Sequence, residues 1–367
     1  MSTTLALLFH RGGRGLVARA RTAASRILAC KLLACGQVDR VVVATRAPQD
    51  WEDLPLEVIP DPPGQWRLGT QLEEVARRYL PERLLYFSSG SGFLLPQEKL
   101  STLARCQPSP PPFAVLNNFY STDFGLVVPP PKQGFSDLVR DNPLGLRLWR
   151  AGYRCYELPR SAATQLDIDT PGELQLLALM KDLPEELARV LAEVPTDRAQ
   201  AILDLLTQVG GELLVVGRVA GQALRILEKT SACRVRVLSE ERGMASLGLA
   251  DEGKVRSLLS FVSSQPAKLV LALAQLADGV VWDTRVWLAA QGLWPLPEDR
   301  FACDLLRPEE VTTPLLRELA QACLEAPVPF LLGGHSLVSG GLYLAAELAW
   351  QGKPELPERW SPLPLPD

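Results

Sequence analysis

Two acids separated by a single aliphatic residue form the stretch of the chain that best suits the binding of a metal ion or a ligand. Asp167-Ile168-Asp169 is followed by Thr170-Pro171-Gly172-Glu173 and then by a helix-forming run, residues 175–181. Thr170 is suited to cap a helix and Pro171 to occupy its first turn. Acids presented at the end of a strand can hold a metal ion or a ligand hydroxyl. The alternative is that Asp167 and Asp169 only cap the helix and are solvated.

A glycine-rich loop near the N-terminus offers a second kind of chemistry. The buried-strand pattern of residues 3–9 is followed by Gly12, Gly13, Arg14 and Gly15, and then by a long helical run over residues 16–35. A loop of this kind turns backbone N–H groups and a helix N-terminus towards a phosphate. Arg14 favours an anion, although a plain tight turn would need the same glycines.

In the second half of the chain, charged and polar residues follow the predicted strands. In a parallel sheet such positions share one edge, where an anion would find arginines and a glycine-rich helix start. The candidate anion-binding residues are Arg218, Arg242, Asp283, Arg285, Gly334, His335 and Ser336. The alternative is that these arginines form local ion pairs with Glu240, Glu241 and Asp283.

The stretch Gly334-His335-Ser336-Leu337-Val338 is close to the nucleophile elbow of a hydrolase. The elbow requires glycine where Val338 stands. The chain has only two histidines, His10 and His335, so a triad has one of these two as its base. This disfavours a hydrolase built on Ser336. His335 is either a ligand or acid–base group, or a hydrogen-bonded structural residue.

These residues are positioned by a regular alternation of predicted strands and helices. Alternation of this kind predicts a mostly parallel sheet covered by helices on both faces, with ligands at the carboxyl ends of the strands. The first half has predicted strands at 3–9, 38–45, 56–60, 83–87, 113–116 and 153–158. After a leucine-rich helical segment, residues 183–209, which Pro195 splits, strands return at 213–218, 233–238, 279–282 and 328–332.

The predicted fold is therefore α/β with two domains, each a mostly parallel sheet flanked by helices. The boundaries are 1–180 for the first domain, 181–209 for a helical connector, 210–352 for a second, Rossmann-like domain and 353–367 for a proline-rich tail.

The first domain resembles the nucleotidyltransferases of the GT-A-like fold, a group that includes molybdenum-cofactor guanylyltransferase-like and phospholactate guanylyltransferase-like proteins. Gly12-Gly13-Arg14-Gly15 is similar to the family's phosphate-binding loop, and residues 38–45 to its second strand. Residues 168–174, Ile-Asp-Thr-Pro-Gly-Glu-Leu, are similar to its late D-T-P-E-D-L signature. The resemblance implies nucleotide binding and Mg²⁺ held by Asp169, with Asp167 or Asp123.

The chain departs from the family at two positions. The family's metal-binding Asp after the central strand is replaced by Ser89-Gly90-Ser91-Gly92, for which Asp123 is a candidate substitute. The lysine after the glycine loop has no counterpart, because Lys31 lies late. A catalytically degenerate nucleotide- or sugar-binding sensor is therefore one alternative. Another is an enzyme whose chemistry lies in the second domain, around Arg218, Arg242, Arg285 and His335.

Composition and charge indicate which classes of protein and which partners the chain does not fit. The 367 residues carry a net charge of −4 and no long basic run, which argues against a nucleic-acid-binding protein. Seven scattered cysteines without a CxxC pair suit reduced thiols in the cytoplasm. No apolar run reaches the ~18 residues of a membrane span, and residues 5–9 are too short for a signal peptide. The expected partners are a nucleotide, either an NTP or a nucleotide-sugar, and a small anionic acceptor.

Overall fold

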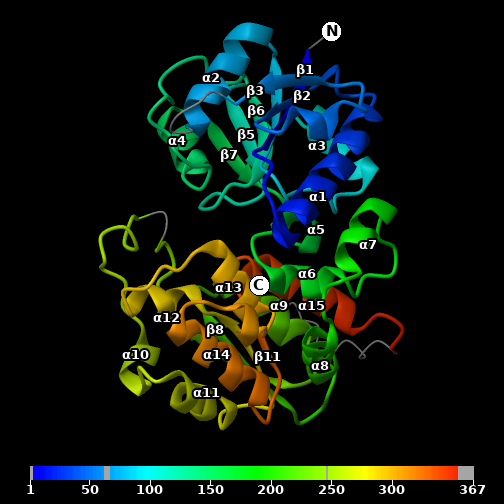
Figure 1. The fold of residues 1–367 in the computed structure, drawn as a ribbon. Coiled ribbons are helices and arrows are strands. Elements are labelled where there is room, and N and C mark those ends of the chain that lie inside the picture. Colours follow the sequence, from blue (N-terminus) through cyan, green and yellow to red (C-terminus); the bar gives the residue numbers. More distant parts are fainter. Residues whose placement is uncertain (1–2, 62–66, 245–246, 354–367) are drawn as a thin grey trace, which may run out of the picture.

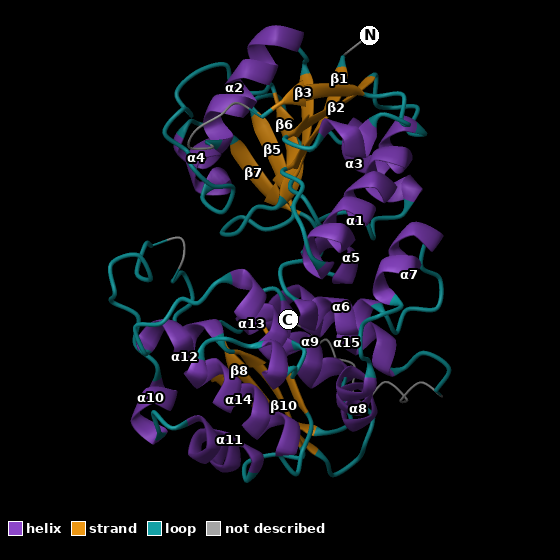
Figure 2. Ribbon diagram, in the orientation of Figure 1, coloured by secondary structure: helices purple, strands orange, loops and turns teal. Residues whose placement is uncertain are grey.

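The computed structural model describes residues 3–61, 67–244 and 247–353. The chain forms two lobes, each with a central sheet covered by helices (Figure 1, Figure 2). This confirms the predicted fold class. The proline-rich stretch from Pro354 onward lies outside the described residues. No helix among those residues is both long and apolar enough to cross a membrane.

The first lobe contains a seven-stranded sheet of order β3-β2-β1-β4-β6-β5-β7. Its strands are β1 (Thr4–His10), β2 (Arg40–Thr45), β3 (Glu57–Pro60), β4 (Arg83–Phe87), β5 (Phe113–Leu116), β6 (Phe124–Val128) and β7 (Arg154–Glu157). Every neighbouring pair is parallel except those that involve β6. The covering helices are α1 (Leu16–Leu33), α2 (Leu68–Tyr79), α3 (Gln97–Arg105), α4 (Leu144–Arg150) and the 3₁₀ turn η1 (Pro48–Trp51).

The antiparallel strand β6 is an element that the strand prediction omits. Its five residues form a short apolar run between a polar loop and Pro129-Pro130-Pro131, and the prolines suggest a break in the chain. The strand nevertheless lies between β4 and β5 and hydrogen-bonds to both. Because it runs against β4, the residue just before it, Asp123, lies beside the carboxyl end of β4.

The second lobe contains a wholly parallel sheet of order β11-β10-β8-β9. Its strands are β8 (Glu212–Gly217), β9 (Arg234–Ser239), β10 (Gly279–Asp283) and β11 (Phe330–Gly333). Its helices are α9 (Gly221–Thr230), α10 (Leu258–Val262), α11 (Pro266–Ala274), α12 (Arg285–Ala290), α13 (Pro297–Asp304), α14 (Pro314–Glu325) and α15 (Leu342–Ala349), with the short turns η2 (Pro308–Glu310) and η3 (Leu337–Gly341). The helices α12 and α13 are short and are also absent from the sequence prediction.

Four helices join the lobes: α5 (Ala162–Gln165), α6 (Pro171–Leu177), α7 (Glu185–Leu191) and α8 (Asp197–Leu206). The break between α7 and α8 confirms the predicted effect of Pro195. One continuous hydrophobic core runs from strand β1 through α6 and α8 to strands of the second sheet, with Leu8, Leu174, Ile202 and Val215 among its members. The two lobes are therefore stabilised together rather than separately.

The carboxyl edges of the two sheets meet at the segment that precedes α6. Ser91, just after β4, forms an isolated antiparallel bridge with Asp167. On the other side, Gly334, just after β11, donates its N–H to Thr170 Oγ1 at 3.3 Å. A side chain at Gly172 would lie 2.6 Å from the Leu332 carbonyl, so α6 approaches β11 at backbone distance. The two predicted ligand edges thus face one junction.

Candidate functional site

The segment Asp167–Glu173 begins helix α6 with a cap in which the side chains of Asp167 and Asp169 take no part. Thr170 is the N-cap residue and Pro171 the first helical position, as the sequence predicts. The buried Glu173 carboxylate accepts the Thr170 backbone N–H at 2.5 Å and the Thr170 hydroxyl at 3.1 Å. This capping box satisfies the start of the helix. The two aspartates are therefore available for another role.

Asp123 and Asp167 lie on opposite sides of the Ser88–Gly92 loop. The Ser88 N–H donates to the Asp123 carbonyl at 2.8 Å, and the Ile168 N–H donates to the Gly90 carbonyl at 3.3 Å. Asn117 fixes Asp123 by donating to its Oδ2 at 2.9 Å. Two carboxylates are thus brought to the end of the central strand, where the loop itself carries no acid.

A third carboxylate, Asp141, belongs to the same electrostatic group. Burial raises the pKa of Asp141, although the Tyr86 hydroxyl donates to its Oδ2 at 2.9 Å. Burial and the charges of Asp141 and Asp169 raise the pKa of Asp123 well above its usual value. Burial, Asp169 and Asp123 do the same to the pKa of Asp167, whose Oδ1 is buried without a hydrogen-bond partner. Close acids that repel one another attract a cation.

These acids do not form a ready-made metal cage. Across residues 3–61, 67–244 and 247–353, no group of three or more histidine, cysteine or acidic side chains is arranged to hold a metal ion. Mg²⁺ commonly uses only one or two protein carboxylates and takes its other ligands from phosphates and water. The pair Asp123 and Asp167, with the unpartnered oxygen of Asp167, fits that mode of binding.

Asp169 forms an ion pair with Arg21, which is not among the candidate residues predicted from the sequence. Arg21, on α1, donates from Nη2 to Asp169 Oδ1 at 2.5 Å and from Nε to the Ile168 carbonyl. Asp169 remains 45 % exposed. Lys31 lies elsewhere, because its ammonium donates to the carbonyls of Phe93 and Leu95. The basic group that contacts Asp169 is therefore Arg21 rather than Lys31.

The glycine loop has a backbone conformation that glycine adopts far more readily than other residues. Gly12 and Gly13 have φ values of +71° and +139°, and a side chain at Gly12 would lie 2.7 Å from the Ala47 Cβ. Gly15 precedes α1, which begins without a capping side chain or an acid in its first turn. Arg14 is exposed. The first N–H groups of a long helix are thus left for solvent or a ligand.

In the second lobe, two of the three candidate arginines form buried ion pairs. Arg218 donates from Nε to Asp283 Oδ2 at 2.6 Å and from Nη2 to Oδ1 at 3.0 Å. Arg285 binds Asp304 through two nitrogens, at 2.7 and 2.5 Å. Arg242 is exposed. The alternative of local ion pairs is therefore correct for Arg218, which pairs with Asp283. Arg285 also forms an ion pair, but with Asp304, which that alternative did not include.

His335 and Ser336 lie where β11 meets the Asp167 segment. The Ser336 hydroxyl is buried, donates to the Asp167 carbonyl and accepts the Asp167 N–H at 3.3 Å. The Ser336 hydroxyl therefore links the two lobes by hydrogen bonds and is not an exposed nucleophile. His335 Nδ1 is buried without a hydrogen-bond partner. Burial, then Arg218, lowers the pKa of His335 to about 4, and Asp169 lies close enough to act on it as well.

The turn after His335 is a single π-helical turn, η3, closed by a bond from the Gly341 N–H to the Ser336 carbonyl at 2.8 Å. A side chain at Gly340 would lie 2.1 Å from the Gln165 carbonyl. The turn therefore fits against the first lobe only because glycine stands there. Turns of this type are frequent at functional sites.

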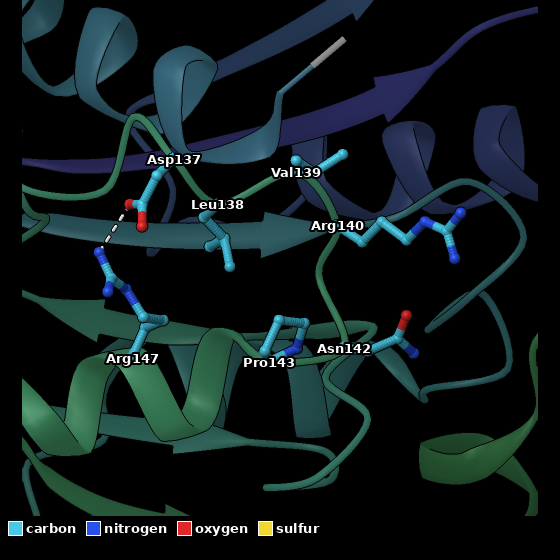
Figure 3. A pocket seen from close by; sticks show the side chains of 7 residues that line it. All are labelled: Asp137, Leu138, Val139, Arg140, Asn142, Pro143 and Arg147. Carbon is cyan, nitrogen blue, oxygen red and sulfur yellow. Dashed lines mark hydrogen bonds and ion pairs between the residues drawn. The ribbon is translucent and has the colours of Figure 1, made fainter. Parts of the chain in front are cut away.

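A pocket of about 300 Å³ opens beside Asp141 in the first lobe. Asp137, Leu138, Val139, Arg140, Asn142, Pro143 and Arg147 line it (Figure 3). Arg147 pairs with Asp137 at 2.7 Å on one side, whereas Arg140 is exposed on the other. Both neighbours of Asp141 line this pocket, so it adjoins the acidic group.

Comparison with known proteins finds partial structural similarity only. No protein-family model and no curated protein match the chain. A CMP:2-keto-3-deoxy-manno-octonic acid synthetase complexed with CTP aligns over 48% of this chain and 97% of its own, at 15% identity and a TM-score of 0.36. A nucleotidyl transferase from Methanothermobacter covers 45% of this chain and 91% of its own, at 17% identity and a TM-score of 0.34.

A cytidylyltransferase from Leptospira borgpetersenii covers 52% of this chain and 92% of its own, at 13% identity and a TM-score of 0.34. Similarities of this size assign no activity to the chain.

We expect Asp283→Asn to lower the free energy of unfolding by about 3–5 kcal/mol, because it leaves the charge of Arg218 buried without a partner. Urea denaturation followed by circular dichroism measures this. The matched control is Glu185→Gln, which breaks the exposed pair with Arg189 and should leave the denaturation midpoint unchanged. Equal effects of the two substitutions would contradict the assignment of a buried pair.

Both histidines should remain neutral between pH 5.5 and 8. Burial lowers the pKa of His10 and of His335 to about 4, below the value of 6.5 for a free imidazole. With only two histidines in the chain, their C–H signals are easily followed by proton NMR. A titration of either signal near pH 6.5 would show that its ring is solvated.

The protein should lose stability as the pH rises from about 4.5 to about 8. Burial, then the charge of Asp169, raises the pKa of Glu173 from 4.5 to about 8, so the folded state binds this proton more tightly than the unfolded state. The stability that this tighter proton binding gives to the folded state is present at low pH and is lost as the pH rises past the folded-state pKa. Glu173→Gln should flatten this slope in a comparison of melting temperatures across the range. Parallel profiles for wild type and variant would refute it.

Proposed function

We propose that this protein is a nucleotidyltransferase that binds an NTP or a nucleotide-sugar between the glycine loop and the acids of the first lobe. The observation that carries the proposal is the convergence of Asp123 and Asp167 at the end of β4. The Ser88–Gly92 loop contains no acid, yet the fold brings one carboxylate to each side of it. In this proposal the glycine loop binds the phosphates and the two carboxylates bind the cation.

Mg²⁺ is the cation that these residues suit. Asp123 and Asp167 would hold it, and Asp169 would contribute after release from Arg21. When bound, Mg²⁺ offsets the charge of the phosphates and favours departure of pyrophosphate. The chain itself supplies the N–H groups of Gly13, Arg14 and Gly15, which bind and orient the phosphates.

The second lobe supplies the other wall of the site. His335 lies close enough to Asp169 and Arg242 for both charges to affect its pKa. Arg242 is exposed and therefore available to a small anionic acceptor, such as a carboxylate or a phosphate ester. Neutral His335 would accept a hydrogen bond from that acceptor.

Two other functions remain alternatives to this one. A nucleotide-binding sensor without turnover would bind the same ligand but release no pyrophosphate. An enzyme with its chemistry in the second lobe would depend on His335 and Arg242 and be indifferent to Asp123. The shared hydrophobic core means that these alternatives should be tested in the full chain, because an isolated second lobe would lose part of its core.

Isothermal titration with each of the four NTPs, with and without Mg²⁺, tests the proposal. Asp123→Asn and Asp167→Asn should weaken binding in Mg²⁺ by about tenfold or more, which corresponds to about 1.4 kcal/mol. In EDTA the same substitutions should leave affinity unchanged or improve it, because removing a carboxylate relieves repulsion with the phosphates.

The matched control is Asp53→Asn, which removes an exposed acid that pairs with Arg26. It should bind like the wild type under both conditions. Failure of all four NTPs to bind would exclude the proposal. Binding without pyrophosphate release in the presence of candidate acceptors would favour the sensor.

A further inference from the structure

His10 and Ser89 form a hydrogen-bonded pair that the proposed nucleotide site does not use. His10 is the last residue of β1, and Ser89 follows the adjacent strand β4. The distance from His10 Nδ1 to Ser89 Oγ is 2.8 Å, and that from His10 Nε2 to Thr22 Oγ1 on α1 is 3.0 Å. A serine beside a histidine that a third group orients is the general arrangement of an activated nucleophile.

The hydrogen bonds around His10 indicate which of its two ring nitrogens carries the proton. The Thr22 hydroxyl donates to the Ala18 carbonyl at 3.1 Å, so its oxygen accepts the Nε2–H of His10. The opposite nitrogen, Nδ1, therefore carries a lone pair and accepts the hydroxyl proton of Ser89. Burial, followed by the charge of Arg21, lowers the pKa of His10 to about 4, which keeps the ring in this neutral form near pH 7.

His10 is more deeply buried than Ser89. Ser89 is half-buried, whereas His10 is 1 % exposed and packs edge-on against Trp51 at 5.5 Å. The hydroxyl of Ser25 lies 3.3 Å from Ser89 Oγ and can donate to it. A carboxylate oxygen of Asp50 lies 4.0 Å from His10 Nε2, beyond hydrogen-bond distance.

The pair also lies inside the proposed nucleotide site. His10 is two residues before Gly12, and Ser89 immediately precedes Gly90. A side chain built at Gly90 would lie 3.1 Å from Asp167 Oδ1. Ser89 is therefore bracketed by the phosphate loop and by a carboxylate of the proposed cation site.

We infer that Ser89 is a nucleophile for a phosphoryl-type electrophile, with His10 as its general base and Thr22 as the residue that orients His10. The identity of the electrophile, the α-phosphorus of a bound NTP, rests on the proposed function; the nucleophile itself does not.

The inferred reaction proceeds in two balanced steps. Ser89 Oγ forms a bond to the α-phosphorus, the bond to pyrophosphate breaks, and the serine proton passes to His10 Nδ1. An oxygen of the acceptor, or water, then attacks the phosphorus of the nucleotidyl-serine. The bond to Oγ breaks, Oγ recovers its proton from His10, and the proton of the acceptor passes to solvent. Transfer through a covalent intermediate divides one displacement into two.

A fluorophosphonate probe tests the nucleophile without any nucleotide. Attack by serine forms an oxygen–phosphorus bond and expels fluoride, and mass spectrometry of the full-length protein's peptides locates the label. We expect labelling of Ser89, none in Ser89→Ala, and a rate lower by about 10²-fold in His10→Gln, the order of magnitude of base catalysis.

Two further variants separate activation from folding. Thr22→Val leaves the imidazole in place but removes its orienting acceptor, so it should slow labelling without a large change in melting temperature. Ser101→Ala, which removes a half-buried serine on α3, should label like the wild type. Labelling of Ser89 no faster than that of Ser101, or a rate indifferent to Thr22→Val and His10→Gln, would overturn the inference.

Incubation with α-³²P-labelled NTPs and Mg²⁺, without an acceptor, tests the electrophile. Radioactivity that survives denaturation and maps to Ser89 supports both the inference and the proposed function. Unimpaired nucleotidyl transfer in Ser89→Ala would overturn the inference and leave the proposed function intact. Fluorophosphonate labelling of Ser89 in a protein that binds no NTP would support the nucleophile and exclude the proposed function.

Discussion

The structure depends on one short segment, Asp167–Thr170, whose backbone is bound on both sides. Ile168 donates to the Gly90 carbonyl of the first lobe, and the Ser336 hydroxyl bonds to Asp167 from the second. Thr170 accepts the N–H of Gly334 and at the same time begins α6. Because a single stretch of chain closes the carboxyl edges of both sheets, the position of each lobe's loops is set by the other. The continuous core beneath it makes this arrangement cooperative.

This junction concentrates charge that the protein only partly neutralises. Arg218 and Arg285 are committed to Asp283 and Asp304, so they stabilise the second lobe more than they offer a site to an anion. In the first lobe the balance is reversed, because the charges of neighbouring aspartates raise the pKa of Asp123 and of Asp167, and Arg21 pairs with Asp169 instead of with either of them. Clustered acids with strongly shifted pKa values are a candidate functional site.

The parts of the fold that could be predicted from the sequence are those with a local signal. Strand β4 and strand β5 have the predicted bounds, because apolar runs flanked by turn residues specify them. The cap at Thr170 and Pro171 is likewise encoded within four residues. Strand β6 is different: five apolar residues before a proline run become a strand only because β4 and β5 offer hydrogen-bonding edges on both sides.

The amino-acid sequence by itself determined most of the strands, the glycine loop, the paired acids and the two-domain α/β class, since these depend on the periodicity and turn chemistry of neighbouring residues. The tertiary structure alone decided which side chains meet. His10 and Ser89 are 79 residues apart, Arg21 and Asp169 are 148 apart, and Asp167 and Ser336 are 169 apart. Contacts at such separations follow from the order of strands in a sheet and from packing between sheets, which no local pattern encodes.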